Sequence, residues 1–314
     1  MADLTLLLPE CSRLAPALPP TLAYWCARGD CGDDAPAGRE AVLRSCFEFT
    51  GTVIPYAALT RSLDASDAGG AVWLRADPAW IMADAVTLRL MACGDVALSA
   101  DESTELARAL KPLFGDAGFP LEATTPSRWY LRCPAGASLP VFSPPQDALG
   151  DDIARHLPQG EQGRRWHHLL NEAQVILHNH PVNAARARRG LAPVNSVWFW
   201  GAGKQPDWVR TPATQVFSED LVVRALGQLA GIAIDAPVAA RVAAVEGDDV
   251  HAIVDLDRAR DAAELERDWL APIDAGIASR AFGSVRLVGA DGLRASYRRA
   301  HRWRFWRRVP RGDA

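Results

Sequence analysis

Short apolar runs alternate with amphipathic segments along this chain, and that alternation constrains its fold more than any other feature. The runs have the length and character of buried strands and lie at residues 4–8, 72–77, 129–133, 197–200 and 250–256. The segments between them have helical spacing of apolar residues, at 21–28, 41–49, 56–63, 163–177 and 221–232. Strands that alternate with helices predict an α/β protein with a sheet flanked by helices.

Several residues predict where helices begin and end. Ser99 and Glu102 have the spacing of a capping box, and Asp261 has the position of an N-cap. The pair His180-Pro181 is expected to end the helix that precedes it, because the residue before proline disfavours the helical conformation. Residues 31–38 are rich in Gly, Asp and Pro, and we expect a loop there.

The middle of the chain has its own turns and strands. We therefore expect an α/β core domain from residues 1–66 and 206–314, interrupted by a smaller α+β lobe at 67–205. A length of 314 residues is sufficient for one large domain with such an insert.

The composition bears on compartment and partners. The formal net charge is −4, which gives no overall attraction to nucleic acid or to an anionic membrane surface. The six cysteines form no C-x-x-C pair, and the N-terminal apolar run is too short for a signal peptide. We expect reduced thiols, a cytoplasmic location and no membrane partner.

The richest block of polar residues lies between His178 and Lys204. Asn183, Arg186 and Asn195 offer amide and guanidinium donors of the kind that bind an oxyanion. A glycine turn at 201–203, before Lys204, would add backbone N–H groups, although the spacing is not that of a phosphate-binding P-loop. The alternative is that these residues only brace a connection from helix to strand.

This block resembles a segment of the archaeal-type cofactor-independent phosphoglycerate mutases, which reads H-P-[IV]-N-x-x-R and continues to W-x-W-G-x-G. Shorter likenesses occur in the same order at residues 74–77, 91–94, 129–132 and 144–147. The whole chain, with its ending at 303–308, most resembles the RpfE-type regulatory proteins, a bacterial group related to those mutases.

The resemblance implies an alkaline-phosphatase-like fold, that is, a phosphoglycerate-mutase-like mixed sheet flanked by helices with a substrate lobe inserted. In that lobe it places Arg75 and Arg132 together with Asn183, Arg186 and Asn195 as ligand-binding residues, and we add Lys204 to this set. Such mutases hold two divalent metals between Asp and His ligands and use a Ser or Thr nucleophile.

The sequence departs from that family at the expected metal ligands. An Asp-Gly pair is expected after the first strand, but residues 8–12 read Leu-Pro-Glu-Cys-Ser. A D-x-x-G-H motif is expected after the later strand, but residues 255–261 read Asp-Leu-Asp-Arg-Ala-Arg-Asp, and Gln146 stands where a histidine belongs. We therefore expect no metal cofactor and a regulatory protein that binds a small phosphorylated metabolite.

Two other hypotheses remain open. The first is an active mutase or phosphatase with a rearranged Mn or Mg site, for which Glu10, Ser12, Asp255 and Asp257 are the catalytic candidates, with Asp261 as a further oxygen ligand. The second is a module that binds a protein or, less in keeping with the charge, a nucleic acid through the Arg- and Trp-rich tail. The simpler interpretation of that tail is a hairpin, with strands at 285–288 and 297–308.

Overall fold

The structure is a computed structural model that describes residues 1–14, 18–32, 35–84 and 86–307. The chain forms two compact units, Met1–Thr50 with Asp207–Ala314, and Gly51–Pro206. The second boundary lies within one residue of the expected one. The first lies earlier, after Thr50, because helix α3 (Tyr56–Asp64) packs against strands β4 (Val72–Ala83) and β8 (Ser196–Lys204) of the second unit.

A mixed sheet organises the first unit. Among the described residues its strands pair in the order β11-β10-β12-β1-β13-β14-β2. Their bounds are β1 Ala2–Leu8, β2 Asp30–Cys31, β10 Gln215–Phe217, β11 Ala233–Asp235, β12 His251–Asp255, β13 Phe282–Gly289 and β14 Arg294–Arg298. The pairs from β11 to β13 are parallel, whereas β14 is antiparallel to both of its neighbours. This confirms the expected α/β fold with a mixed sheet.

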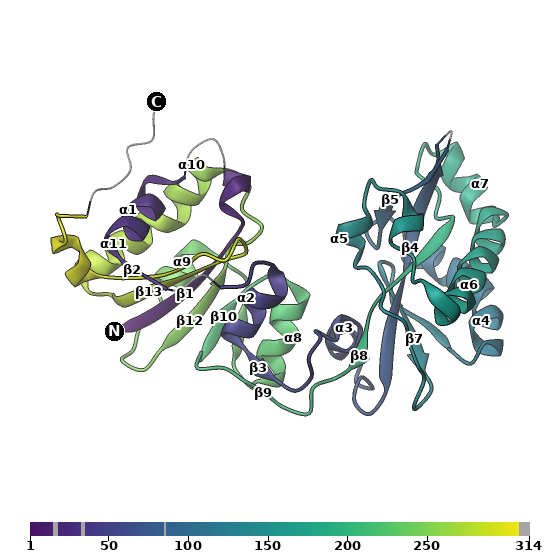
Figure 1. Cartoon of the computed structure of the whole chain (residues 1–314), viewed down its shortest axis with the longest axis horizontal. Helices are drawn as coiled ribbons and strands as arrows, with labels where there is room; N and C mark the ends of the chain where they lie inside the picture. The colour runs from purple at the N-terminus through teal and green to yellow at the C-terminus, as the bar shows by residue number, and fades with distance from the viewer. Residues whose placement is uncertain (15–17, 33–34, 85, 308–314) are drawn as a thin grey trace. The chain divides into compact units, whose positions relative to one another are not determined.

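Helices lie along this sheet, as Figure 1 shows. Leu4 and Leu6 of β1 pack in one core with residues of α1 and α11, while Leu7, which points to the other face, is equally buried. Because both faces are covered there, β1 ends in three consecutive buried leucines, Leu6, Leu7 and Leu8. The helices of this unit are α1 Pro20–Arg28, α2 Arg39–Cys46, α8 Leu221–Leu229, α9 Ala239–Ala243, α10 Ala262–Leu265 and α11 Ala271–Ser279, with short helical turns at Cys11–Leu14, Glu266–Leu270 (π-helical) and Arg299–Trp303. Two short strands, β3 (Glu48–Phe49) and β9 (Val209–Arg210), pair with each other.

An antiparallel sheet organises the second unit, with strand order β5-β4-β7-β6 and β8 paired to β4. The remaining strands are β5 Leu88–Cys93, β6 Leu121–Thr125 and β7 Arg128–Cys133. The helices are α3, α4 Ala100–Asp116, α5 Pro145–Ala148, α6 Gly160–His178 and α7 Pro181–Arg188, with a 3-10 turn at Ile153–Arg155. Trp166 of α6 and Phe199 of β8 meet in the core between helix and sheet, with ring centroids 4.9 Å apart.

The structure corrects several local expectations. β4 continues through Pro78 to Ala83, and Pro181 begins α7 instead of only ending α6, because proline suits the first turn of a helix. The tail after Arg298 forms a 3-10 turn, not a strand, and Trp303 and Phe305 are both largely exposed. Arg308 and residues 33–34 lie outside the described residues.

The expected helix ends at Ser99 and Asp261 are present. The Ser99 hydroxyl and the Glu102 carboxylate form a complete capping box, and Asp261 accepts hydrogen bonds from two backbone N–H groups of α10. No helix in the described part of the chain is long and apolar enough to cross a bilayer.

Candidate functional site

The carboxyl ends of three parallel strands of the first unit lie next to one another. Leu7 of β1 pairs with Asp255 of β12, and Phe217 of β10 pairs with Val254 of β12. In open α/β sheets, ligand-binding groups collect in the loops that follow this edge. Here those loops carry Ser218 and Asp220, Asp255 and Asp257, and Glu10 and Ser12.

Arg39, in the first turn of α2, lies among the carboxylates at this edge. Its Nη2 atom lies 2.9 Å from Oδ2 of Asp255 and 3.5 Å from Oδ2 of Asp220, and its Nη1 atom lies 3.8 Å from Oδ2 of Asp257. The Ser218 hydroxyl donates to Oδ2 of Asp255 at 2.7 Å. One guanidinium therefore bridges carboxylates from two different strand ends.

Burial and charge act together in this cluster. Burial tends to lower the pKa of Arg39, but the charges of Asp255, Asp220 and Asp257 outweigh it and raise the pKa. The pKa of Asp257 is raised, first by burial and then by the neighbouring Asp255, with Arg39 acting in the opposite direction. Arg39 is thus held as a permanent cation whose charge the three carboxylates share.

The residues at this edge do not fit a two-metal centre of the kind that the resemblance implies. The carboxylate oxygens that would have to bind a divalent ion are already paired with the guanidinium of Arg39. Asp261 is the third proposed oxygen ligand. Its Oδ1 atom accepts hydrogen bonds from the N–H groups of Ala263 and Glu264, at 2.7 and 3.0 Å. Within residues 1–14, 18–32, 35–84 and 86–307, no three His, Cys, Asp or Glu residues are arranged to hold a metal ion.

Glu10 and Ser12 follow β1 at the same edge. The Ser12 hydroxyl donates to Oε2 of Glu10 at 3.4 Å, and this contact is exposed to solvent. Between them, the backbone N–H of Cys11 donates to Asp291 at 3.0 Å, and burial together with Asp291 raises the pKa of the Cys11 thiol to about 12. The structure therefore places all four catalytic candidates, Glu10, Ser12, Asp255 and Asp257, at one edge of the sheet.

Arg186 in the second unit is buried, with 1% of its surface exposed. Its guanidinium donates to the carbonyl oxygens of Val96, Ala97 and Ala192 and to Oε2 of Glu102, at 2.6 to 3.1 Å. This side chain ties α7 to the start of α4, because Glu102 also forms the capping box there. An anion would have to replace these internal partners to bind Arg186.

Asn183 and Asn195 form similar internal bridges. The Asn183 amide donates to the carbonyls of Leu177 and Val194 and accepts from the Val194 N–H. The Asn195 amide exchanges two hydrogen bonds with the backbone of Ile81, at 2.7 and 2.9 Å. The alternative considered from the sequence, that these residues brace the helix-to-strand connection, describes the contacts observed here.

Arg75 lies beneath α3 with 5% of its surface exposed. It makes a two-pronged salt bridge to Asp77, with both distances 2.8 Å, and donates to the Thr60 hydroxyl of α3 at 3.1 Å. Asp77 also accepts from the Trp200 indole at 2.7 Å. The guanidinium of Arg75 therefore joins strand and helix instead of facing solvent.

Lys204 and Arg132 are exposed, but the register separates them. Lys204 pairs with Val72 and Arg132 with Trp73, so their side chains leave opposite faces of the sheet. The glycines before Lys204 belong to β8 and do not form a turn. Gly203 leaves room for Pro55, because a Cβ atom at Gly203 would lie 2.5 Å from that residue. The predicted ligand-binding residues are therefore not gathered around one cavity.

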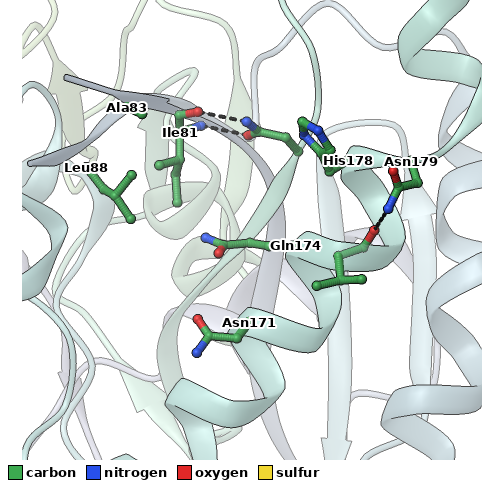
Figure 2. Close-up of a pocket in the computed structure, with 9 residues that line it drawn as sticks. Ile81, Ala83, Leu88, Asn171, Gln174, His178 and Asn179 are labelled. Atoms are coloured by element: carbon green, nitrogen blue, oxygen red, sulfur yellow. Dashed lines mark hydrogen bonds between the residues drawn. The ribbon is translucent and has the colours of Figure 1, made fainter. Parts of the chain in front are cut away.

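A pocket of about 480 Å³ in the second unit contains one of them, Asn195. It lies between α6 and the hairpin of β4 and β5, and Figure 2 shows Asn171, Gln174 and His178 on its helical side, with Ile81 and Leu88 opposite. The described residues that line it include amides and one imidazole but no Arg or Lys. Such a lining suits hydrogen bonding to a neutral group better than binding a phosphate.

Sequence reasoning missed Arg39 and Asp220. Asp220 had a usable signal, because Val216 and Phe217 form a short apolar run directly before Ser218 and an amphipathic helix. Arg39 had none, since it is one arginine at the start of a helix and its partners lie 181 to 218 residues further along the chain, from Asp220 to Asp257.

Known proteins resemble parts of this chain. No family model matches it. A probable 2,3-bisphosphoglycerate-independent phosphoglycerate mutase of Geobacter sulfurreducens is 35% identical over 109 residues, which cover 35% of this chain and 27% of the relative. The corresponding mutase of Methanosarcina barkeri is 34% identical over 93 residues, 29% of this chain and 23% of the relative.

The chain thus spans about a quarter of the length of the curated relatives it matches. Among solved structures, a cofactor-independent phosphoglycerate mutase from Thermoplasma acidophilum aligns with 95% of this chain and 90% of its own, at 17% identity and a TM-score of 0.47. This chain is therefore a divergent relative of the archaeal-type, 2,3-bisphosphoglycerate-independent phosphoglycerate mutases.

Proposed function

We propose that this phosphoglycerate-mutase-like protein is regulatory, in the manner of the RpfE-type proteins, and that it binds a small phosphorylated acid without a metal ion. The observation that carries the proposal is the position of Arg39 between Asp220, Asp255 and Asp257. Metal-dependent phosphoryl transfer uses divalent ions to bind the attacking and leaving oxygens. In this chain a fixed organic cation balances the carboxylates at the corresponding edge of the sheet.

The proposed ligand class follows from the relatives. Curated relatives are named phosphoglycerate mutases, so phosphoglycerates are the first compounds to test. The proposed contact in the second unit is the exposed cation Lys204, since Arg132 leaves the opposite face of the sheet and cannot reach the same small ligand.

A thermal-shift titration with 3-phosphoglycerate, with and without Mn²⁺, tests the proposal. A ligand at 100 times its Kd adds about 2.7 kcal/mol to the unfolding free energy. We expect a rise in Tm with 3-phosphoglycerate alone, no further rise when Mn²⁺ is added, and none with unphosphorylated glycerate at the same concentration. The variant Lys204→Gln should reduce the shift, with Lys111→Gln as the control that removes the other lysine.

Two results would contradict the proposal. A shift that requires Mn²⁺, together with mutase or phosphatase turnover that a chelator abolishes, would establish the enzyme hypothesis, with Glu10, Ser12, Asp255 and Asp257 as the residues to replace. If no phosphorylated acid changes the Tm, the claim that this protein binds such a ligand is wrong.

A further inference from the structure

Three arginines surround a pocket at the opposite edge of the first unit's sheet. Arg280 follows α11, and Arg299 and Arg302 lie in the 3-10 turn Arg299–Trp303. The pocket has a volume of about 460 Å³, and Met1, Ile277, Phe282 and Trp303 also line it. Phe282 pairs with Ala2 at the start of β1, whereas Arg39 contacts the far end of the sheet. A strand of this length separates the two sites by roughly 20 Å.

The charges of these arginines are not balanced within the described part of the chain. None of the three lies within 4.0 Å of a described carboxylate oxygen, whereas nearby Asp30 is already paired with Arg304 and His301. The pKa of Arg299 is lowered, first by the positive charge of Arg302, then by burial and by Arg280. The Nε atom of Arg299 is buried and has no hydrogen-bond partner. An anion in the pocket would relieve this repulsion.

The backbone at Arg280 adds a second indication. This residue has φ of 72°, the left-handed conformation that commonly ends a helix and that favours glycine. An arginine there costs about 1 kcal/mol relative to glycine. The side chain that it places at the pocket is a candidate reason for that cost.

Trp303 supplies an aromatic surface beside the charges. The residue is 66% exposed, and the guanidinium carbon of Arg302 lies 4.9 Å from the centre of its ring. An exposed indole stacks readily on a planar base, and arginine forks bind phosphate oxygens in pairs. The pocket therefore combines the two groups that a nucleotide requires.

We propose that this pocket binds a nucleoside phosphate, with the phosphate on Arg280, Arg299 and Arg302 and the base stacked on Trp303. A free nucleotide and one nucleotide of a single strand share this chemistry. The site is independent of the function proposed above, because it lies at the other edge of the sheet and uses none of the same residues.

Isothermal titration calorimetry on the full chain tests this site with AMP, inorganic phosphate and a ten-nucleotide oligothymidylate. We expect AMP to bind, and Arg302→Gln to weaken it about tenfold, the loss that follows from one charge-assisted contact. Arg108→Gln is the matched control, because it removes the same charge from a 72% exposed arginine in the other unit. Trp303→Leu should weaken AMP and leave inorganic phosphate unchanged. Arg302 and Trp303 are both exposed, so circular dichroism should show folded variants.

Each outcome has a definite meaning. Absence of AMP binding, or equal affinity in Arg302→Gln and Arg108→Gln, would overturn the proposal. If inorganic phosphate binds as tightly as AMP, the base makes no contribution. That result would overturn the stacking role of Trp303 and the proposal that the ligand is a nucleotide. If the oligonucleotide binds much more tightly than AMP, and its affinity falls as the salt concentration rises, the proposal holds and the bound nucleotide belongs to a single-stranded nucleic acid. Equal affinity for both supports a free nucleotide.

Discussion

Replacement of Arg39 by glutamine is the most direct test of the charge cluster at the carboxyl edge. The substitution keeps most of the side-chain volume and removes the cation from Asp220, Asp255 and Asp257. The side chain of Asp255 is only 5% exposed, so water cannot solvate the charge that is left behind. Breaking such a pair from one side costs about 3 kcal/mol. For a unit of this size we expect the Tm to fall by roughly 6 to 12 °C at pH 7.

The pH dependence follows from the same carboxylates. The pKa of Asp257 is already raised in the folded state, so its contribution to stability is lost as the pH rises through that folded pKa. Without Arg39 the carboxylates repel one another more strongly, and protonation relieves that repulsion. We therefore expect the difference in unfolding free energy between the native chain and Arg39→Gln to shrink as the pH falls from 7 towards 4.

The variant also tests whether Arg39 stands in for a metal ion. Once the guanidinium is gone, Mn²⁺ should raise the Tm of Arg39→Gln and leave the native chain unchanged. Differential scanning calorimetry measures both effects. Arg258→Gln is the control, because Arg258 and Glu219 form an ion pair at the same edge with side chains 71% and 63% exposed. Equal Tm values for the two variants at pH 7 would refute the argument, since they would show that solvent screens the Arg39 cluster as well.

Three further predictions concern stability. Arg186→Met should destabilise the second unit by about 3 kcal/mol or more in urea denaturation, because it removes the buried cation beside Glu102 and leaves three carbonyl oxygens without their donor. The exposed Arg189→Met should cost under about 1 kcal/mol, and equal losses in the two variants would contradict this reasoning. Ser99→Ala should cost about 1 kcal/mol by the same assay, and Ser99→Asp should retain the cap. Burial lowers the pKa of His251, so its stabilising effect is present above pH 6.5 and is lost as the pH falls through its folded pKa. His251→Gln should make the unfolding free energy less dependent on pH below pH 6.5. If the slope is unchanged in this variant, the pH dependence in that range comes from other groups.

The sequence alone determined the features whose causes are local. The alternation of strand and helix patterns fixed the fold class, and short-range hydrogen bonding fixed the helix starts at Ser99 and Asp261. Each of these depends on residues only a few positions apart, which is the range over which a sequence pattern carries physical information.

Only the tertiary structure decided which polar residues meet. Arg186 and Asn183 have the composition of an anion site, yet folding gives their donors to carbonyls as far away as Val96. Arg39 had no local signal, yet folding brings it to carboxylates from two strand ends. A buried guanidinium must satisfy its hydrogen bonds wherever partners exist, and strand order and register determine which partners those are. That order is a property of the whole sheet, so no segment of the sequence specifies it alone.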